Sequence, residues 1–421
     1  MDISIPFQKG IIQFQVKEEN LAEVLTPHLA SPIDDLLQDI QKSLDNPLGQ
    51  PALREWIPPD SEVLILCDDN TRLTPTDKLL QPLILTLNEA GIDDDQISIL
   101  IALGTHRPMT EVEVTNKVGT EVSRRIRVQN HSWDDPDQLM SVGLSKSGTP
   151  VHVNKAALAA DIIIGLGSIV PHHIAGFSGS SKIIQPGICG AATTTETHLA
   201  ATRGQDSLLG VENNAVRRDM DDIADRVGLR TILNVVLNHE GLVAGVFGGE
   251  MREVYAKGVD LAKKVYGVPY HEAPEIVVAS SCPCDIDFWQ AHKSLYPSAR
   301  IVKRGGTIIV VTPAPEGVSS THSSLLNFAS WPSGKIEKVC REGKIEDGVA
   351  AALAVGWARV REKASVIMVS PGISPEEKKS LGFTHADNLE DALAVAFQQQ
   401  GAKARLTVLT HAPEILPLRA Y

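Results

Sequence analysis

The chain has 421 residues, of which 43% are hydrophobic and 22% are charged, a composition typical of soluble globular proteins. Its 39 Lys and Arg against 52 Asp and Glu give a formal net charge of −13, which argues against a surface for nucleic acid or for an anionic membrane. The sequence has no apolar run long enough to cross a bilayer and no signal-peptide pattern, so we expect neither a membrane nor a nucleic-acid partner.

Residue types and spacing predict alternating strands and helices in the first half of the chain. The apolar run 63–67 predicts a buried strand, and Thr74-Pro75 predicts the start of a helix that ends at Gly91 and is kinked at Pro82. A second apolar run at 97–103 completes a βαβ unit with parallel strands. The pattern continues with predicted strands at 161–166 and 230–237 and a predicted helix at 215–228.

A second alternation begins after Pro274. It consists of predicted strands at 275–279, 307–311, 365–369 and 406–409, and a predicted helix at 288–300. A chain of this length exceeds what one core usually organises, so we expect two domains that meet near Pro269 and Pro274. The predicted fold class is therefore α/β, with a largely parallel sheet flanked by helices in each domain. The predicted domains are 1–268 and 274–408, and the tail 409–421 is predicted to cross back to the first domain.

The cysteines are few and odd in number, which favours reduced thiols and a cytoplasmic location over a disulfide framework. They are Cys67, Cys189, Cys282, Cys284 and Cys340. Cys282-Pro283-Cys284 has no second cysteine pair to complete a zinc site, so we interpret it as a turn.

Two polar clusters follow predicted strands of the first domain. Asp68 to Arg72 combines carboxylates, a hydroxyl and a guanidinium, and Arg72 is suited to hold a carboxylate or phosphate through two hydrogen bonds. The alternative is an Asx-rich turn that leads into the helix cap. His106 follows the next strand, where it is either a general base or a loop histidine paired with an acidic residue.

A third cluster, between His172 and Lys182, follows the predicted strand 161–166. Ligand sites in open α/β sheets usually lie where strands end, and glycines such as Gly179 let backbone N–H groups approach an anion closely. A lysine in such a place is a cation that becomes a nucleophile when desolvated. His198 follows on a predicted helix and is a candidate proton carrier or metal ligand.

The fourth cluster lies in the second domain. Gln290 and Lys293 are three residues apart and share one face of the predicted helix, where an amide and an ammonium can hold a substrate carboxylate or hydroxyl. The alternative is an ordinary solvated helix face. Because the clusters come from both domains, we expect a small-molecule site in the cleft between the domains.

Taken together, these clusters resemble the nickel-pincer-nucleotide lactate racemase family over most of the chain. The resemblance rests on the spacing of His172, Lys182 and His198 combined with the other clusters. The residues that carry it are Asp69-Asn70-Thr71-Arg72, Gly104-Thr105-His106-Arg107, His172, Gly176-Phe177-Ser178-Gly179, Lys182, Pro186-Gly187, His198, Gln290 and Lys293.

The resemblance implies reversible hydride transfer between a 2-hydroxy acid and a nickel-bearing pyridinium-3,5-bisthiocarboxylic acid mononucleotide, which dedicated cofactor-synthesis enzymes would supply. It implies that Lys182 tethers the cofactor and that His198 is a nickel ligand, a donor type that suits Ni(II). His106 and His172 would be the two acid–base residues. The cofactor contacts would be Asp69, Asn70, Thr71, Arg72, Ser178 and Gly179, and the substrate contacts Arg72, Gln290 and Lys293.

The sequence departs from the lactate pattern beside these residues. Ser180-Ser181 precedes the lysine, His173-Ile174 replaces aromatic residues after the first histidine, and Trp357 has no clear register with the family's substrate-side tryptophan. Smaller side chains near His172 would leave space for a substrate larger than lactate. Two other functions remain open from the residues alone: a metal-dependent lyase or hydrolase that uses His172 and His198, and a non-catalytic protein that binds a small anion.

Overall fold

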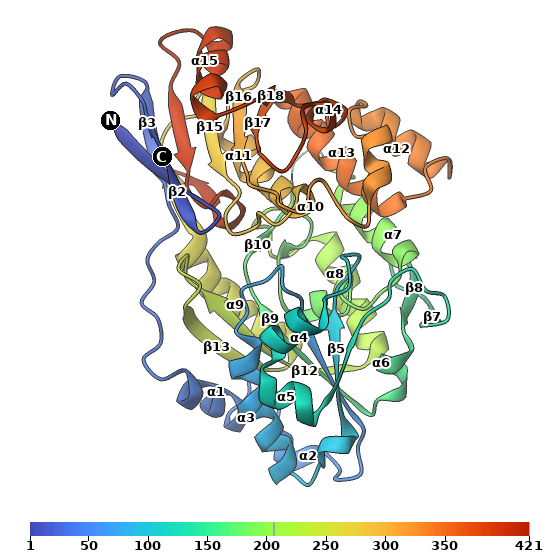
Figure 1. Ribbon diagram of the computed structural model, residues 1–421. Coiled ribbons are helices and arrows are strands. Elements are labelled where there is room, and N and C mark those ends of the chain that lie inside the picture. The colour runs from blue at the N-terminus through green and yellow to red at the C-terminus, as the bar shows by residue number, and fades with distance from the viewer. Residues whose placement is uncertain (205–206, 421) are drawn as a thin grey trace.

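The computed structural model describes residues 1–204 and 207–420. It contains two six-stranded sheets that are largely parallel and flanked by helices (Figure 1). The first half of the molecule is built around a sheet of strands between residues 63 and 249, and the second half around a sheet of strands between residues 276 and 409 joined by residues 21–25. This architecture confirms the predicted α/β fold class. All the predicted strands are present, each within two residues of its predicted ends.

The first sheet has the strand order β13-β12-β9-β4-β5-β6. Its five strands from β12 to β6 run parallel, and β13 is an antiparallel edge strand. In chain order the strands are β4 (Val63–Asp68), β5 (Ile97–Ala102), β6 (Arg127–Asn130), β9 (Ile162–Ser168), β12 (Leu229–Leu237) and β13 (Val243–Gly249). The sheet brings the carboxyl ends of β9, β4 and β5 side by side, which places three of the predicted polar clusters at one edge.

Alternating side chains of β4 face two different cores, as expected for a strand covered on both faces. Val63 and Ile65 pack in the core that contains α1 to α5, whereas Leu64 and Leu66 pack in the core that contains α8 and α9. Helix α3 continues through Pro82. The helices of this half are α1 (Leu36–Asp45), α2 (Leu53–Trp56), α3 (Thr76–Glu89), α4 (Glu111–Val118), α5 (Thr120–Arg125), α6 (Lys155–Ala159), α7 (Ala191–Ala201), α8 (Ala215–Val227) and α9 (Met251–Tyr266).

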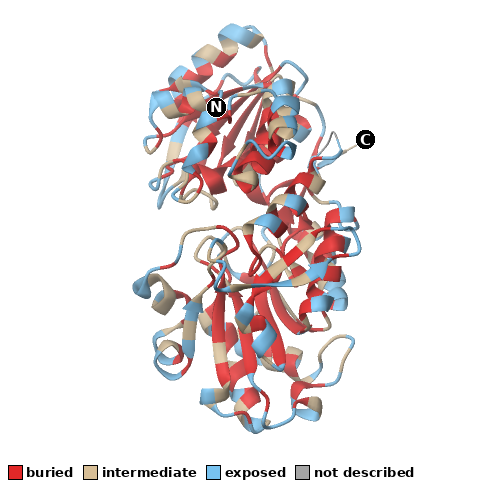
Figure 2. Ribbon diagram, turned by 90° about the vertical axis from the view of Figure 1, so that its right-hand side faces the viewer, coloured by how far each residue is buried: buried red, intermediate tan, exposed pale blue. Residues whose placement is uncertain are grey.

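The second sheet has the strand order β18-β17-β16-β15-β19-β3, and every pairing in it is parallel. Its strands are β3 (Leu21–Leu25), β15 (Ile276–Ser280), β16 (Thr307–Val311), β17 (Ser365–Val369), β18 (Thr384–Ala386) and β19 (Leu406–Leu409). The helices of this half are α10 (Phe288–Ala291), α11 (Leu295–Ile301), α12 (Ser333–Arg341), α13 (Gly348–Lys363), α14 (Pro375–Ser380) and α15 (Leu389–Gln400). The central strands of both sheets are buried, and exposure is concentrated on the outer helices, the loops and the edge strands (Figure 2).

The predicted helix at 288–300 is divided in the structure. A 3-10 turn, His292–Ser294, separates α10 from α11, so the run stays helical but is not one α-helix. Cys282-Pro283-Cys284 forms a turn, and all five cysteines are free thiols.

The N-terminal segment differs from the predicted division of the chain, which placed residues 1–268 in one domain. Strand β3 pairs with β19 of the second sheet, and the hairpin of β1 (Asp2–Phe7) and β2 (Gly10–Gln15) packs on the same sheet through Ile5 and Phe14. These strands satisfy their backbone hydrogen bonds and bury their apolar faces against the C-terminal half, a long-range pairing that local sequence patterns do not reveal.

The end of the chain lies between the two halves. Strand β20 (Leu416–Arg419) pairs with β14 (Gly267–Tyr270), and Leu416 packs in a core with residues of the first half such as Phe177 and Val236. Of the tail predicted to return to the first domain, residue 421 is outside the described residues. The remaining strands are the pairs β7 (Leu139–Leu144) with β8 (Pro150–Asn154) and β10 (Pro171–His172) with β11 (Gly176–Phe177). Across residues 1–204 and 207–420, no helix is long and apolar enough to span a membrane.

Candidate active site

A cavity between the two halves of the molecule collects the predicted polar clusters. It encloses about 880 Å³ including its open mouth, and both halves contribute to its lining. The first half contributes loops after β4, β5 and β9, and the second half contributes the start of α10 and the turn that follows it. Ten of the twelve predicted site residues line this cavity: Asp69, Arg72, His106, His172, Ser178, Gly179, Lys182, His198, Gln290 and Lys293.

The other two predicted cofactor contacts, Asn70 and Thr71, do not line this cavity. The Asn70 amide donates to Glu113 Oε1 at 2.9 Å, which turns it toward α4. The Thr71 N–H and hydroxyl both donate to Asp69 Oδ1, at 3.1 and 2.5 Å, in a turn of the Asx type. The structure therefore gives these two residues a role in shaping the loop.

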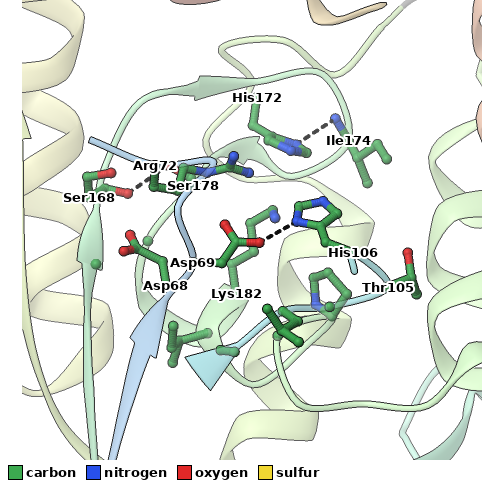
Figure 3. Close-up of a pocket in the computed structure, with 18 of the residues that line it drawn as sticks. Asp68, Asp69, Arg72, Thr105, His106, Ser168, His172, Ile174, Ser178 and Lys182 are labelled. Carbon is green, nitrogen blue, oxygen red and sulfur yellow. Dashed lines mark hydrogen bonds and ion pairs between the residues drawn. The ribbon is translucent and has the colours of Figure 1, made fainter. Parts of the chain in front are cut away.

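His106 is oriented by Asp69. Its Nδ1 lies 2.5 Å from Asp69 Oδ2, and the Asp69 side chain is only 4% exposed (Figure 3). Although burial alone would raise the pKa of Asp69, the neighbouring His106 and Arg72 lower it, so Asp69 is a carboxylate that accepts a hydrogen bond. Burial lowers the pKa of His106, partly opposed by Asp69, so the imidazole is neutral near pH 7.

Gln290 fixes the tautomer of His106 from the second half. Its amide oxygen accepts from Lys293 Nζ and from Arg72, the latter at 3.4 Å, which leaves its NH₂ group to donate to His106 Nε2 at 3.0 Å. Because His106 Nε2 accepts this hydrogen bond, the ring proton is on Nδ1 and is donated to Asp69. His106 thus presents a proton acceptor to the cavity, the state required of a general base.

His172 presents a hydrogen-bond donor to the cavity, whereas His106 presents an acceptor. Its Nδ1 accepts backbone N–H groups of Ile174 and Ala175 at 3.2 and 3.4 Å, so the neutral ring carries its proton on Nε2 (Figure 3). Burial, followed by the nearby Lys182 charge, keeps the pKa of His172 well below its usual value. The two histidines follow strands on either side of β4, one as an acceptor and the other as an N–H donor.

Lys182 lies in the 3-10 turn Ser180–Ile183 and reaches the cavity without a hydrogen-bond or ion-pair partner among the residues the structure describes. Burial, together with the charges of Arg72 and Lys293, keeps the pKa of its amine well below the usual value. A lowered pKa increases the uncharged fraction of the amine, which is the nucleophilic form. His198, on α7, has its pKa lowered to about 3 by burial and by Lys182, so it offers a neutral imidazole of the kind that binds metals.

The loop before Lys182 is held by internal hydrogen bonds. Ser178 Oγ donates to Ser168 O at 2.7 Å and accepts from Val170 N at 2.9 Å, so this hydroxyl is occupied within the loop. Gly179 has φ +76°, and a Cβ there would lie 2.5 Å from the Ile169 side chain, so only glycine fits. A phosphate at this loop would therefore rely on backbone N–H groups and nearby cations more than on the Ser178 hydroxyl.

Several lining residues were not among the sequence-predicted site residues. They include His173, His292, Thr194 and Asn234. His173 stacks on both His172 and Tyr296, and its Nε2 lies 3.4 Å from His292 Nε2. In the sequence, the position of His292 between the predicted contacts Gln290 and Lys293 could have indicated that His292 also lines the site. Trp357 is fully buried behind His292 and does not line the cavity.

We expect Asn70→Ala to change kcat/KM by less than about threefold, because the lost hydrogen bond is outside the cavity and Glu113 keeps its ion pair with Arg107. Steady-state kinetics of the cofactor-loaded variant would check this. A loss of cofactor from the variant would instead restore the sequence-based assignment of Asn70 as a cofactor contact.

Comparisons with family models and with known proteins all point to the lactate racemase family. Residues 7–210 match the lactate racemase N-terminal domain and residues 270–415 match the lactate racemase C-terminal domain. The lactate racemase of Lactiplantibacillus plantarum is 29% identical over 415 residues, which cover 97% of each chain. That of Thermoanaerobacterium thermosaccharolyticum is 27% identical over 407 residues, which cover 94% of each chain.

Two solved structures share the fold. The lactate racemase apoprotein of Thermoanaerobacterium thermosaccharolyticum superposes with a TM-score of 0.88 at 25% identity, over 99% of this chain and 100% of that chain. A Thermotoga maritima protein superposes with a TM-score of 0.75 at 20% identity, over 93% of this chain and 100% of that chain.

Proposed function

The chain belongs to the lactate racemase family, and we propose that it racemises or epimerises 2-hydroxy acids with a nickel-pincer nucleotide. The observation that carries this proposal is the arrangement of His106 and His172. They are two neutral imidazoles of opposite hydrogen-bonding polarity that line the same cavity as Lys182 and His198. Inversion by hydride transfer at C2 requires the hydroxyl proton to be removed from one enantiomer and returned in the other, and two histidines can carry it.

The residues present fit the cofactor. Lys182 has an amine of depressed pKa with no hydrogen-bond partner among residues 1–204 and 207–420, which suits an amide-type tether. His198 is a neutral imidazole suited to nickel. When bound, the cofactor would supply the reversible hydride acceptor. Within the described parts of the chain, no three His, Cys, Asp or Glu side chains gather to hold a metal ion. A metal at His198 would therefore need further ligands from the cofactor, whereas a lyase or hydrolase that uses protein ligands alone gains no support.

The substrate carboxylate is best placed on the cations of the cavity. Arg72 and Lys293 converge on the Gln290 amide oxygen from the two halves of the molecule. A carboxylate bridging these cations would replace that amide oxygen with a charged acceptor, which forms stronger hydrogen bonds. The substrate would then be held while its C2 carbon becomes planar, so that C2 can be reduced from either face while its oxygen is protonated.

The two histidines would exchange roles between the two directions. His106 takes the hydroxyl proton on Nε2, and Asp69 stabilises the imidazolium that forms. His172 hydrogen-bonds the oxygen through its Nε2–H. To serve as the acid it must become cationic, with a proton on Nδ1, and release the N–H groups of Ile174 and Ala175. We therefore expect its proton transfer to require a small shift of this ring.

We expect the KM for a 2-hydroxy acid to rise above about pH 8. Burial and the nearby Arg72 charge lower the pKa of Lys293 to about 8. Because a lysine is cationic below its pKa, the charge that holds the carboxylate is present at pH 7 and is lost as the pH increases through 8. A rise of up to about tenfold in KM per pH unit follows in the free enzyme. Lys293→Arg stays cationic, so its KM should stay flat to pH 9. A flat wild-type profile would contradict the assignment.

We also propose that the preferred substrate is larger than lactate. His173, Trp289 and His292 line the cavity together with His172, and they offer ring nitrogens as well as apolar surface. A screen of 2-hydroxy acids of increasing size, using protein co-produced with the cofactor-synthesis enzymes, tests both proposals. Inversion of a larger acid with higher kcat/KM than lactate is the expected result. Binding without inversion of any acid would favour the anion-binding alternative.

A further inference from the structure

The loop that carries His106 is held from the second half of the molecule at the residues on both sides of the histidine. Thr105 and Arg107 each contact residues between 316 and 322, while His106 itself contacts Gln290. None of these contacts involves a predicted cofactor or substrate ligand except Gln290. The contacts of Thr105 and Arg107 are therefore not explained by the binding of cofactor or substrate.

On one side, His322 forms a buried link across the interface. Its Nε2 lies 3.0 Å from Thr105 Oγ1, and its Nδ1 lies 2.8 Å from Asp347 Oδ2, with a side chain that is 0% exposed. The ring stacks on Trp289, 4.0 Å between centroids, and Trp289 directly precedes Gln290. His322 thus contacts the immediate neighbours of both His106 and Gln290, the two residues whose side chains meet in the cavity.

On the other side, Arg107 forms a two-point ion pair with Glu316. Arg107 Nε lies 2.8 Å from Glu316 Oε2, and a terminal nitrogen lies 2.5 Å from Oε1. Paired contacts of this kind fix orientation as well as distance. The same guanidinium holds Glu113 of its own half at 2.8 and 2.9 Å, so it stays paired if Glu316 is removed.

We infer that Glu316 and His322 are positioning residues that hold His106 in contact with Gln290. The inference rests on the proposed role of His106 as a proton carrier. When the second half packs against the first, the contacts at Thr105 and Arg107 restrain the loop. The His106 imidazole then contacts the Gln290 amide, which fixes its tautomer. When these contacts are lost, His106 keeps Asp69 but no longer has a fixed distance to the carboxylate-binding group of Gln290 and Lys293.

The test compares Glu316→Gln with Glu121→Gln. Glu121 is the matched control because it shares Arg125 with a second carboxylate, Asp94, as Glu316 shares Arg107 with Glu113, but it lies far from the cavity in α5. The first readout is the rate at which diethyl pyrocarbonate acylates His106 in cofactor-free protein, followed by peptide mass spectrometry. The second readout is kcat and KM for inversion of a 2-hydroxy acid by cofactor-loaded protein.

In the Glu316→Gln variant, we expect diethyl pyrocarbonate to acylate His106 at least about threefold faster than in the wild type. We expect kcat to fall by about 10- to 100-fold, with a smaller change in KM. Glu121→Gln should match the wild type in both readouts. His322→Phe, which keeps the stacking on Trp289 but not the hydrogen bond to Thr105, should give the same pattern. Unchanged acylation and kcat in Glu316→Gln would overturn the inference. If the wild type inverts no acid, the acylation rates still decide whether His106 is restrained, and only the proposed function fails.

Discussion

Replacing Asp69 with asparagine is expected to lower kcat by about 10²- to 10⁴-fold without unfolding the protein. In the variant, the amide oxygen would keep accepting from the Thr71 N–H, which turns the NH₂ group toward His106 Nδ1. An NH₂ group cannot accept the ring proton, so the imidazole would move its proton to Nε2. The lone pair that receives the substrate proton would then be absent from the cavity.

The measurement is the initial rate of inversion by wild-type and Asp69→Asn proteins of equal nickel content. Equal thermal unfolding midpoints would show that the loss is one of chemistry. Asp69→Glu, which keeps the acceptor but changes its distance, should retain more activity than Asp69→Asn. An Asp69→Asn variant with kcat close to that of the wild type would remove Asp69 from the account and leave His106 without its orienting partner.

Replacing Lys182 with methionine is expected to abolish activity and, at the same time, to stabilise the cofactor-free protein. The amine is partly buried without a partner among the described residues, next to the cationic Arg72 and Lys293. Methionine has a similar shape and carries no charge, so removing an amine that lies close to two other cations should raise the free energy of unfolding by about 1 kcal/mol. A residue that costs stability where it stands is typical of a functional site.

Intact-mass analysis and thermal unfolding check this expectation together. Wild-type protein from cells that make the cofactor should gain the mass of the nucleotide on the peptide containing Lys182, and the variant should not. Lys257→Met, a surface lysine on α9, is the control for a general effect of removing a charge. A variant that is fully active and carries the cofactor would show that Lys182 is not the tether.

The sequence was sufficient to predict eight of the twelve strands in the two six-stranded sheets, and the polar residues that follow three of those strands. Apolar runs such as 63–67 and 97–103 mark buried parallel strands, and the carboxyl ends of parallel strands share one edge, which places Asp69 and His106 together. For the same reason ten of the twelve predicted site residues line the cavity. Position along the chain does not give side-chain direction, however. Asn70 instead donates to Glu113 of α4, and Thr71 donates to Asp69 within the loop.

The contacts that could not be predicted are those between distant segments. Strand β3 pairs with β19 although the two strands lie near opposite ends of the sequence, and no local sequence pattern specifies that partner. His322 and Glu316 do not belong to a recognisable sequence motif, because their contacts with Thr105 and Arg107 form only when the two halves pack together. Tautomers also depend on such contacts: Gln290 of the second half decides which nitrogen of His106 carries the proton.

We propose that this chain inverts 2-hydroxy acids through hydride transfer at C2, with His106 and His172 moving only the hydroxyl proton. The most direct test is to incubate cofactor-loaded protein with one enantiomer of a 2-hydroxy acid carrying deuterium at C2, in ordinary water. We expect the opposite enantiomer to form with its C2 deuterium retained, because the histidines move only the proton on oxygen, which exchanges with solvent. Inversion with loss of the deuterium to water, or no inversion at all, would contradict it.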